Sequence, residues 1–353
     1  MKKFLLILII MILSVSVSIS VEAKSYKLRY AHMNAPSAVT GVQAKMLADL
    51  VAEKTNGAVT IQVFPSSQLG NLQEMAEQVQ SGVIALHHNT MAGIGSLFEP
   101  LSALDTPYLY RDVDHLMKVV DTQSSPVMKK LNERMIKARG VRILYNFYFG
   151  TRQLTCDRAI KKPEDLNKIK IRAIPFPIYM TAVEGLGAVA TPVNWSEVPT
   201  ALATGIVNGQ ENPVDVIYNN KLYDLQSHMM LTGHVMAAEC VVINEKVWQK
   251  FSPEIQKQIM EAAQEVSKKA TQMTLDREAE NLEKIKTAGM TVIGPDEGLQ
   301  IELFRKRTQE LVASRFDKKY GDLYYEIRQS RTVHSEGWRT HPSKNFSSLK
   351  ALS

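Results

Sequence analysis

A helix of unusual length constrains this chain more than any other feature. Ser252-Pro-Glu-Ile has the chemistry of a helix start, with a serine cap, a proline at the first helical position and then an acid. Apolar residues recur at helical spacing from Ile255 to Ile285, and Gly289 ends the pattern. About 35 residues at ~1.5 Å each would span roughly 50 Å, which is longer than one lobe of a small protein. We therefore expect this helix to lie across two lobes.

The chain is long enough for two such lobes. Its 353 residues suit two cores of roughly 100–150 residues each. Hydrophobic patterning at the N-terminal end predicts strand 26–32, helix 41–55, strand 59–64, helix 71–82 and strand 83–88. This alternation requires parallel strands joined by crossover helices, which indicates an α/β fold.

A second α/β unit follows the first. Beyond a helical stretch at 112–138 that is interrupted near Pro126, the predicted elements are strand 141–149, helix 177–187, strand 188–193, a helix capped by Asn194 or Ser196 and ending at Gly205, a polar turn 207–213, and strand 238–244. The last strand returns to the first unit. We predict lobe I over residues 24–149 and 238–277, and lobe II over 150–237 and 278–330.

The two ends of the chain have sequence patterns that differ from the rest of the chain. Lys2 and Lys3 precede an apolar run, and Val21-Glu-Ala23 supplies small residues at the spacing of a cleavage site, so residues 1–23 are typical of a secretory signal peptide. An uncleaved anchor is the alternative, because the apolar stretch is long. Residues 331–353 show no periodicity and are expected to form a loose tail. We expect the mature chain outside the cytoplasmic membrane.

Composition excludes several classes of protein. With 45% apolar and 22% charged residues the chain resembles a globular protein, and no later segment approaches the ~18 continuous apolar residues that span a bilayer. Half of the net charge of +6 lies in residues 331–353, so the body is not strongly basic. This argues against binding of nucleic acid, which needs basic residues concentrated on one face.

Neither cysteine nor histidine indicates a metal. Cys156 and Cys240 lack metal or redox spacing, and one disulfide or two buried free thiols are both compatible with an exported protein. The eight histidines, including the pair His87-His88, show no metal-binding spacing on one helix face. We predict no metal and no cofactor.

Two arginines mark the candidate site. Arg152 follows the predicted strand 141–149, and Arg172 lies in the apolar run 169–174. Strand ends are where α/β proteins build binding sites. A guanidinium group can grip a carboxylate through two parallel hydrogen bonds, so two arginines at one cleft would favour an anionic ligand.

Several motifs in this region resemble a known family. Gly150-Thr-Arg-Gln-Leu-Thr, Pro163-Glu-Asp-Leu with Lys170-Ile-Arg172, Trp195-Ser-Glu-Val, and Val207-Asn-Gly-Gln-Glu-Asn-Pro213 together resemble the extracytoplasmic solute-binding proteins of TRAP transporters, DctP type. Asn71-Leu-Gln-Glu after Pro65-Ser-Ser-Gln-Leu-Gly also looks like that family. The resemblance runs from about Tyr26 to Ile327. This sequence departs from the usual pattern at Asn208 and at residues 167–169.

The resemblance implies a two-lobed periplasmic-binding-protein clamshell, crossed by a long helix, that binds a small organic acid between its lobes. It implies that Arg172 pairs with the ligand carboxylate and that Arg152 is a second cationic contact. The other implied ligand-binding residues are Asn212, Trp195, Asn34, Asn89 and Thr90. The implied partners are the membrane subunits of a TRAP permease, and the implied form is a periplasmic monomer without enzymatic activity.

Alternatives remain at this stage. Trp195 is also compatible with a core position and Asn212 with a turn cap, while Gln153 and Glu211 are more typical of structural residues. An enzyme could use the same arginines to hold a carboxylate substrate, although no nucleophile elbow, zinc motif or dinucleotide fingerprint is present. A sensor or a receptor for an ATP-driven importer is a further alternative. The sequence does not choose among C4-dicarboxylates, sugar acids and keto acids.

Overall fold

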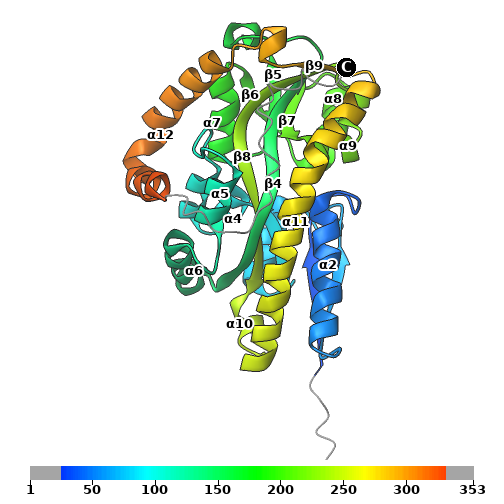
Figure 1. The fold of residues 1–353 in the computed structure, drawn as a ribbon, viewed down its shortest axis with the longest axis vertical. Helices are drawn as coiled ribbons and strands as arrows, with labels where there is room; N and C mark the ends of the chain where they lie inside the picture. The colour runs from blue at the N-terminus through cyan, green and yellow to red at the C-terminus, as the bar shows by residue number, and fades with distance from the viewer. Residues whose placement is uncertain (1–24, 331–353) are drawn as a thin grey trace, which may run out of the picture.

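The computed structural model describes residues 25–330, which form two α/β lobes joined by long shared elements (Figure 1). Nine strands make one sheet in the order β2-β1-β3-β8-β4-β7-β5-β6, and β9 pairs with β8. The strands β1 to β3 lie in one lobe, and β5 to β7 lie in the other. The predicted two-lobed α/β class is confirmed.

Parallel strands form the core of the first lobe. β1 (Tyr26–Ala31) pairs with both β2 (Val59–Phe64) and β3 (Leu86–Thr90). The crossovers are α2 (Val39–Lys54) and α3 (Leu72–Ser81). Asn71 caps α3, because its side chain accepts hydrogen bonds from the second and third backbone N–H groups and Glu74 accepts one from Asn71 in return. β3 begins later than the predicted strand 83–88 and extends beyond it to include Asn89 and Thr90.

Helices complete the first lobe. They are α4 (Met91–Gly95), η1 (Glu99–Asp105), α5 (Val113–Val120) and α6 (Pro126–Arg139). Asp112 and Ser125 cap α5 and α6 through their side chains, so the predicted interruption near Pro126 is confirmed. Gly140 ends α6 with a φ of 64°, a left-handed conformation that glycine adopts without strain.

The second lobe contains short elements around a small parallel sheet. They are η2 (Pro163–Leu166), β5 (Lys170–Ala173), α7 (Pro177–Leu186), β6 (Val189–Pro192), η3 (Trp195–Glu197), α8 (Val198–Ala203), β7 (Gly209–Pro213), α9 (Val214–Asn219), η4 (Leu222–Asp224), β9 (Thr291–Ile293) and η5 (Pro295–Glu297). The predicted side-chain cap before Trp195 is wrong, because η3 and α8 form without one. The predicted polar turn 207–213 is also wrong, since most of it is the buried strand β7.

Two strands run through both lobes. β4 (Val141–Cys156) and β8 (His228–Asn244) are antiparallel neighbours of 16 and 17 residues, and Figure 1 shows them side by side along the molecule. Both predicted strands, 141–149 and 238–244, were therefore too short. The β4–β8 register shifts near Gly150, which has a φ of 121° that only glycine adopts readily. Arg152 thus lies inside a strand and not after one.

The long helix is present as predicted. α11 (Pro253–Thr287) has 35 residues and begins at Ser252, whose side chain accepts from the backbone N–H of Ile255. Its first half buries Ile259 and Val266 in the core of the first lobe, and its last turns bury Leu282 and Ile285 in the second. The short α10 (Glu245–Trp248) precedes it. Figure 1 shows α11 running past both lobes, so the expectation from its length is confirmed.

A second long helix, α12 (Ile301–Gln329), was not predicted. It packs on α7, where Gly185 permits close approach, since an added Cβ would lie 2.8 Å from Thr308. Its aromatic residues Phe316 and Tyr324 enter the hydrophobic cluster of the first lobe. The α12 helix therefore links the lobes on the side away from α11 (Figure 1).

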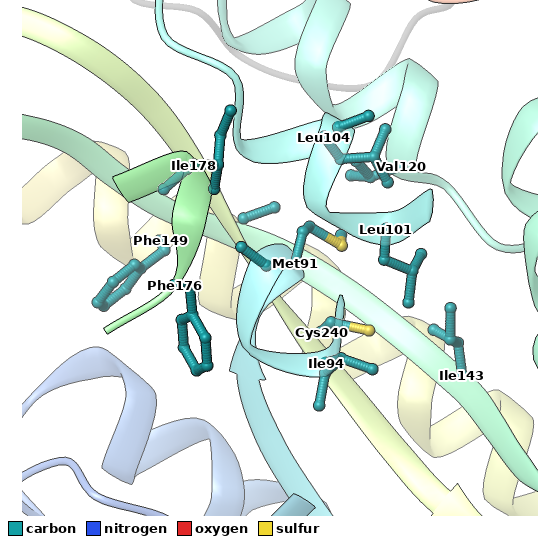
Figure 2. Packing of buried hydrophobic residues seen from close by; sticks show 14 of the residues in the cluster. Met91, Ile94, Leu101, Leu104, Val120, Ile143, Phe149, Phe176, Ile178 and Cys240 are labelled. Atoms are coloured by element: carbon teal, nitrogen blue, oxygen red, sulfur yellow. The ribbon is translucent and has the colours of Figure 1, made fainter. Parts of the chain in front are cut away.

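Apolar side chains join the two lobes. Phe149 from β4, and Phe176 and Ile178 at the start of α7, belong to the same buried cluster as Met91 and Leu101 of the first lobe. Figure 2 shows Phe149, Phe176 and Ile178 on one side of Met91. The lobes are therefore in direct apolar contact, with the candidate site nearby.

Three further predictions concern the cysteines, a membrane span and the two chain ends. Cys156 and Cys240 are buried free thiols. Cys156 pairs with His228 across the β4–β8 ladder and Asn146 pairs with Cys240, so ten residues of strand, roughly 33 Å, separate the cysteines, too far for a disulfide. Within residues 25–330, no helix is both long and apolar enough to cross a bilayer. The signal peptide and the tail fall outside the described residues.

Candidate functional site

Arg172 is a buried cation without an acidic partner. It lies on β5, where it pairs with Thr191 of β6, and its side chain is 1% exposed. Its Nε donates to the Val193 carbonyl at 2.9 Å, and its guanidinium group lies 5.7 Å from the centre of the Trp195 ring. Its Nη1 atom has no hydrogen-bond partner among the described residues.

Burial disfavours the charge on Arg172. Burial, with a smaller contribution from the nearby charge of Arg152, lowers the pKa of Arg172 to about 10, although the charge of Glu211 acts in the opposite direction. No carboxylate of residues 25–330 forms an ion pair with it. Arg172 is therefore poised to gain from an anion.

Arg152 has the opposite environment. Its Nε and Nη2 donate to the two carboxylate oxygens of Glu211 at 2.5 and 2.9 Å, and Nη2 also donates to Oδ1 of Asn212 at 3.0 Å. Burial opposes the charge, but the attraction of Glu211 outweighs it and raises the pKa of Arg152. Burial would also raise the pKa of Glu211, yet Arg152 and His234 hold it at about 2. This arrangement is a neutral, buried ion pair.

Asn212 belongs to the same network. It lies on the buried strand β7, opposite Gln153 of β4, and its Nδ2 donates to Oε1 of Gln210 at 2.5 Å. Both ends of its amide thus have protein partners. Gln153 accepts from the backbone N–H of Gly233 at 2.8 Å, which is a structural role.

Trp195 covers Arg172 from the second lobe. It begins η3, is half-buried, and packs against two hydrophobic clusters as well as the guanidinium group. An aromatic face over a guanidinium is favourable and fixes its plane. Trp195 therefore serves both packing and the orientation of Arg172.

Asn34 lies in the first lobe at the end of a relay of buried polar groups. Its Oδ1 is 2.9 Å from Nε2 of His88, and since this oxygen can only accept, the His88 proton is on Nε2. Nδ1 of His88 then accepts from the hydroxyl of Tyr30 at 2.7 Å. Burial lowers the pKa of His88 well below its usual value, which keeps the ring neutral.

Asn89 and Thr90 have local roles at the end of β3. Oδ1 of Asn89 accepts from the backbone N–H of Thr90 at 2.9 Å, and Oγ1 of Thr90 accepts from that of Gly93 at 3.1 Å, which caps α4. A Cβ at position 93 would lie 2.1 Å from the Asn89 side chain, so Gly93 is what admits Asn89. Among the described residues, neither side chain is shown in contact with an arginine.

The structure adds three residues that sequence reasoning did not single out. The Tyr179 ring lies 5.0 Å from the guanidinium carbon of Arg152, and its hydroxyl has no hydrogen-bond partner among the described residues. Asp105 accepts from the backbone N–H of Ala92 at 2.7 Å through one oxygen only, and Glu239 has no partner on either oxygen. A charged residue inside the apolar strand Ala238–Asn244 was a visible signal for Glu239. Asp105 gave none.

The histidines do not form a metal site in the described region. His32 and His88 stack with ring centres 4.7 Å apart, and Nδ1 of His87 donates to the Ala31 carbonyl oxygen at 2.9 Å. Within residues 25–330 no group of three or more histidine, cysteine or acidic side chains is arranged to hold a metal ion. The cluster is instead part of the packing beneath Asn34.

Comparison with known proteins identifies the family to which this architecture belongs. Residues 30–319 match the model of "Bacterial extracellular solute-binding protein, family 7" (DctP). The chain belongs to this family. It is 32% identical over 278 residues to the sialic acid-binding periplasmic protein SiaP of Vibrio cholerae, covering 79% of this chain and 84% of that protein.

Other family members are similar over most of their length. The 2,3-diketo-L-gulonate-binding periplasmic protein YiaO of Escherichia coli is 30% identical over 267 residues, covering 75% of this chain and 80% of YiaO. The crystal structure of a TRAP periplasmic solute-binding protein from Polaromonas sp. JS666, bound to D-erythronate, superposes with a TM-score of 0.80 at 30% identity, covering 88% of this chain and all of that one. The resemblance to TRAP-type solute-binding proteins is confirmed.

Proposed function

We propose that this protein is the periplasmic receptor of a TRAP-type transporter and binds a small organic acid between its lobes. One observation carries the proposal: Arg172 is a fully buried cation whose Nη1 atom is unpaired and whose charge no described carboxylate balances. Leaving a buried charge unpaired is costly, and a carboxylate ligand would relieve that cost. The ligands named for SiaP, YiaO and the Polaromonas protein are all acids, which supports the same conclusion.

Entry of the ligand requires the lobes to separate. Arg152, Arg172, Asn212, Asn34, Asn89 and Thr90 are all at most 3% exposed. A solute therefore reaches Arg172 only when the apolar contact around Met91 opens. Closure then removes water from the carboxylate–guanidinium pair and strengthens it. In such a cycle the ligand shifts the population toward the closed form, which the membrane subunits would recognise.

The remaining assignments are part of the same proposal. We infer that Trp195 packs on the ligand as well as on Arg172, that Asn34 donates through its free amide end, and that Asn212 acts through Arg152. Asn89 and Thr90 would shape the first-lobe wall. The lobe boundaries stay as predicted, with 24–149 and 238–277 in one lobe and 150–237 and 278–330 in the other. We also propose that the protein is exported by a signal peptide, is monomeric and catalyses no reaction.

The proposal is tested by binding of organic acids, followed by calorimetry on Arg172→Lys. Lysine keeps the charge but loses the planar fork, so affinity should fall by at least ~2 kcal/mol, about 30-fold. The matched control is Arg142→Lys, which changes another bidentate arginine, paired with Glu245 at 2.7 and 2.8 Å. An unchanged dissociation constant for Arg172→Lys would remove Arg172 from the site.

Two outcomes would favour the alternatives. Chemical turnover of a bound acid would indicate an enzyme. Binding without turnover, together with genes for an ATP-driven importer or a signalling kinase beside this one, would indicate a different class of receptor.

A further inference from the structure

The charges around the site allow only one carboxylate. Both arginines are buried, but Glu211 already holds Arg152 through two hydrogen bonds. That pair is neutral as a unit. Among the described residues Arg172 forms no ion pair of its own, although the charge of Glu211 also attracts it. A ligand with one carboxylate balances it, whereas a second carboxylate would be buried without a partner.

Unpaired acceptors also lie in the neighbourhood of Arg152. Oδ1 of Asp105 and both carboxylate oxygens of Glu239 are buried and have no hydrogen-bond partner among the described residues. Glu239 pairs with Thr90 across β3 and β8, and Asp105 is joined to α4 just beyond Thr90 through Ala92. Both acceptors therefore lie near Thr90, the last residue of β3.

Tyr179 connects these acceptors to the arginines. Its ring packs on Arg152, and its buried hydroxyl has Asp105 and Thr90 as polar neighbours, without a well-formed hydrogen bond to either among the described residues. The helix α7, which carries Tyr179, also contacts η1, which carries Asp105. Tyr179 also acts on Arg172. Arg172, Tyr179, Asp105 and Glu239 are thus neighbours around one region of the molecule.

We propose that this receptor selects monocarboxylic acids that carry hydroxyl groups and rejects dicarboxylic acids. Arg172 binds the single carboxylate, while Asp105 and Glu239 accept hydrogen bonds from the ligand's hydroxyls. This inference rests on the proposed function and narrows its substrate class. A buried acceptor that gains a donor favours the ligand that supplies it, and a site built on such contacts discriminates strongly.

An ammonium group fits these acceptors less well. The three unpaired oxygens, Oδ1 of Asp105 and both of Glu239, belong to two side chains, whereas an ω-amino acid carries all of its donors at that end on one nitrogen. A second ligand carboxylate meets a different problem. Burial raises the pKa of Asp105 to about 6, which leaves it mostly ionised at pH 7.5, and two carboxylates would then face each other.

The test uses acids matched in carbon number. Calorimetry at pH 7.5 compares aldonates with four, five and six carbons, the aldarates of the same length, the unsubstituted fatty acids and the ω-amino acids. At each length that binds, we expect the aldonate to bind at least 10-fold more tightly than the other three. An aldarate, fatty acid or amino acid that binds as well as its aldonate would overturn the inference.

Two variants connect the selectivity to the named residues. Asp105→Asn and Glu239→Gln keep the shape but replace an acceptor with a donor, so the ratio of aldonate to aldarate affinity should fall several-fold. Arg172→Lys should weaken both acids alike and leave this ratio unchanged. A ratio that neither carboxyl variant alters contradicts the assignment, with thermal unfolding used to verify that the variants fold.

The two proposals fail in different ways. If an acid binds through Arg172 but dicarboxylates are preferred, the receptor function stands and the selectivity is wrong. If no acid in the series binds at millimolar concentration, the selectivity is wrong. The receptor function itself falls only if keto acids and other organic acids also fail to bind.

Discussion

Arg152 and Arg172 have the same side chain, the same near-complete burial and closely related positions in one sheet, yet their surroundings differ. Arg152 is matched by Glu211 and Asn212, and its pKa is raised. Arg172 has one backbone carbonyl and an aromatic face, and its pKa is lowered to about 10. The first is stabilised within the protein. The second depends on something that the described chain does not provide.

This difference teaches how a receptor can hold a charge ready for its ligand. A guanidinium that already has a carboxylate must exchange one partner for another, which gains little. A guanidinium held in place by Trp195 and Val193 without a carboxylate gains a full ion pair when an acid arrives. Two arginines in one site can therefore have separate roles, one structural and one for recognition.

The largest expected effect is on stability, from Arg152→Gln. Removing this cation leaves Glu211 buried, with His234 at 3.1 Å as its remaining side-chain hydrogen-bond partner. Loss of one partner of a buried pair costs about 3–5 kcal/mol. Urea unfolding of the ligand-free protein should show this loss. Adding Glu211→Gln should restore part of the stability, since both charges are then gone, and a double variant less stable than the single one would contradict the ion-pair account.

Local sequence predicted the surroundings of Arg172 better than those of Arg152. Arg172 lies in an apolar run that reads as a strand, and β5 forms there. Gly-Gln-Glu-Asn-Pro, in contrast, has the composition of a turn and became the buried strand β7. Its polar side chains are satisfied by Arg152 and by each other, and such partners distant in the chain leave no trace in local composition.

The long helices and strands also differ in how far the local sequence predicts them. The serine start and the apolar period were enough to predict α11. The α12 helix also has apolar side chains at every fourth position from Phe304 to Tyr324, with one threonine among them, so its signal was present and was missed. The extension of β4 through Arg152 could not be predicted, because it depends on pairing with β7 and β8.

A smaller effect is expected from a change in pH. It tests whether Asp105, like Arg172, is a buried charge that the fold does not compensate fully. Burial raises its pKa from 3.8 to about 6, despite the nearby charge of Arg152. The carboxyl group of Asp105 then binds its proton more tightly in the folded state than in the unfolded state. Its ionisation therefore does not lower the free energy of unfolding below pH 3.8, and lowers it progressively as the pH rises to 6. The full cost is about 3 kcal/mol.

Comparison of Asp105→Asn with the unmodified protein isolates this cost. The variant should be similar in stability at pH 4 and more stable by up to ~3 kcal/mol at pH 7. Glu278 is also buried, with a pKa raised to about 7, but it is present in both proteins and its effect cancels. Urea unfolding at pH 4, 5, 6 and 7 measures the difference. A constant difference across that range would show that Asp105 is ionised normally.

The smallest effect, and the most direct contrast with Arg152→Gln, comes from Arg172→Gln. The same substitution here removes a buried charge that has no acidic partner, at the loss of the Val193 hydrogen bond and the Trp195 contact. We expect the ligand-free protein to gain about 1 kcal/mol, because replacing a poorly compensated charge with a neutral group is often stabilising. The same variant should lose the stabilisation that an acid ligand gives to the unmodified protein. Thermal unfolding with and without the ligand measures both. A loss of stability as large as that of Arg152→Gln would mean that Arg172 is a structural residue, and the distinction between the two arginines would disappear.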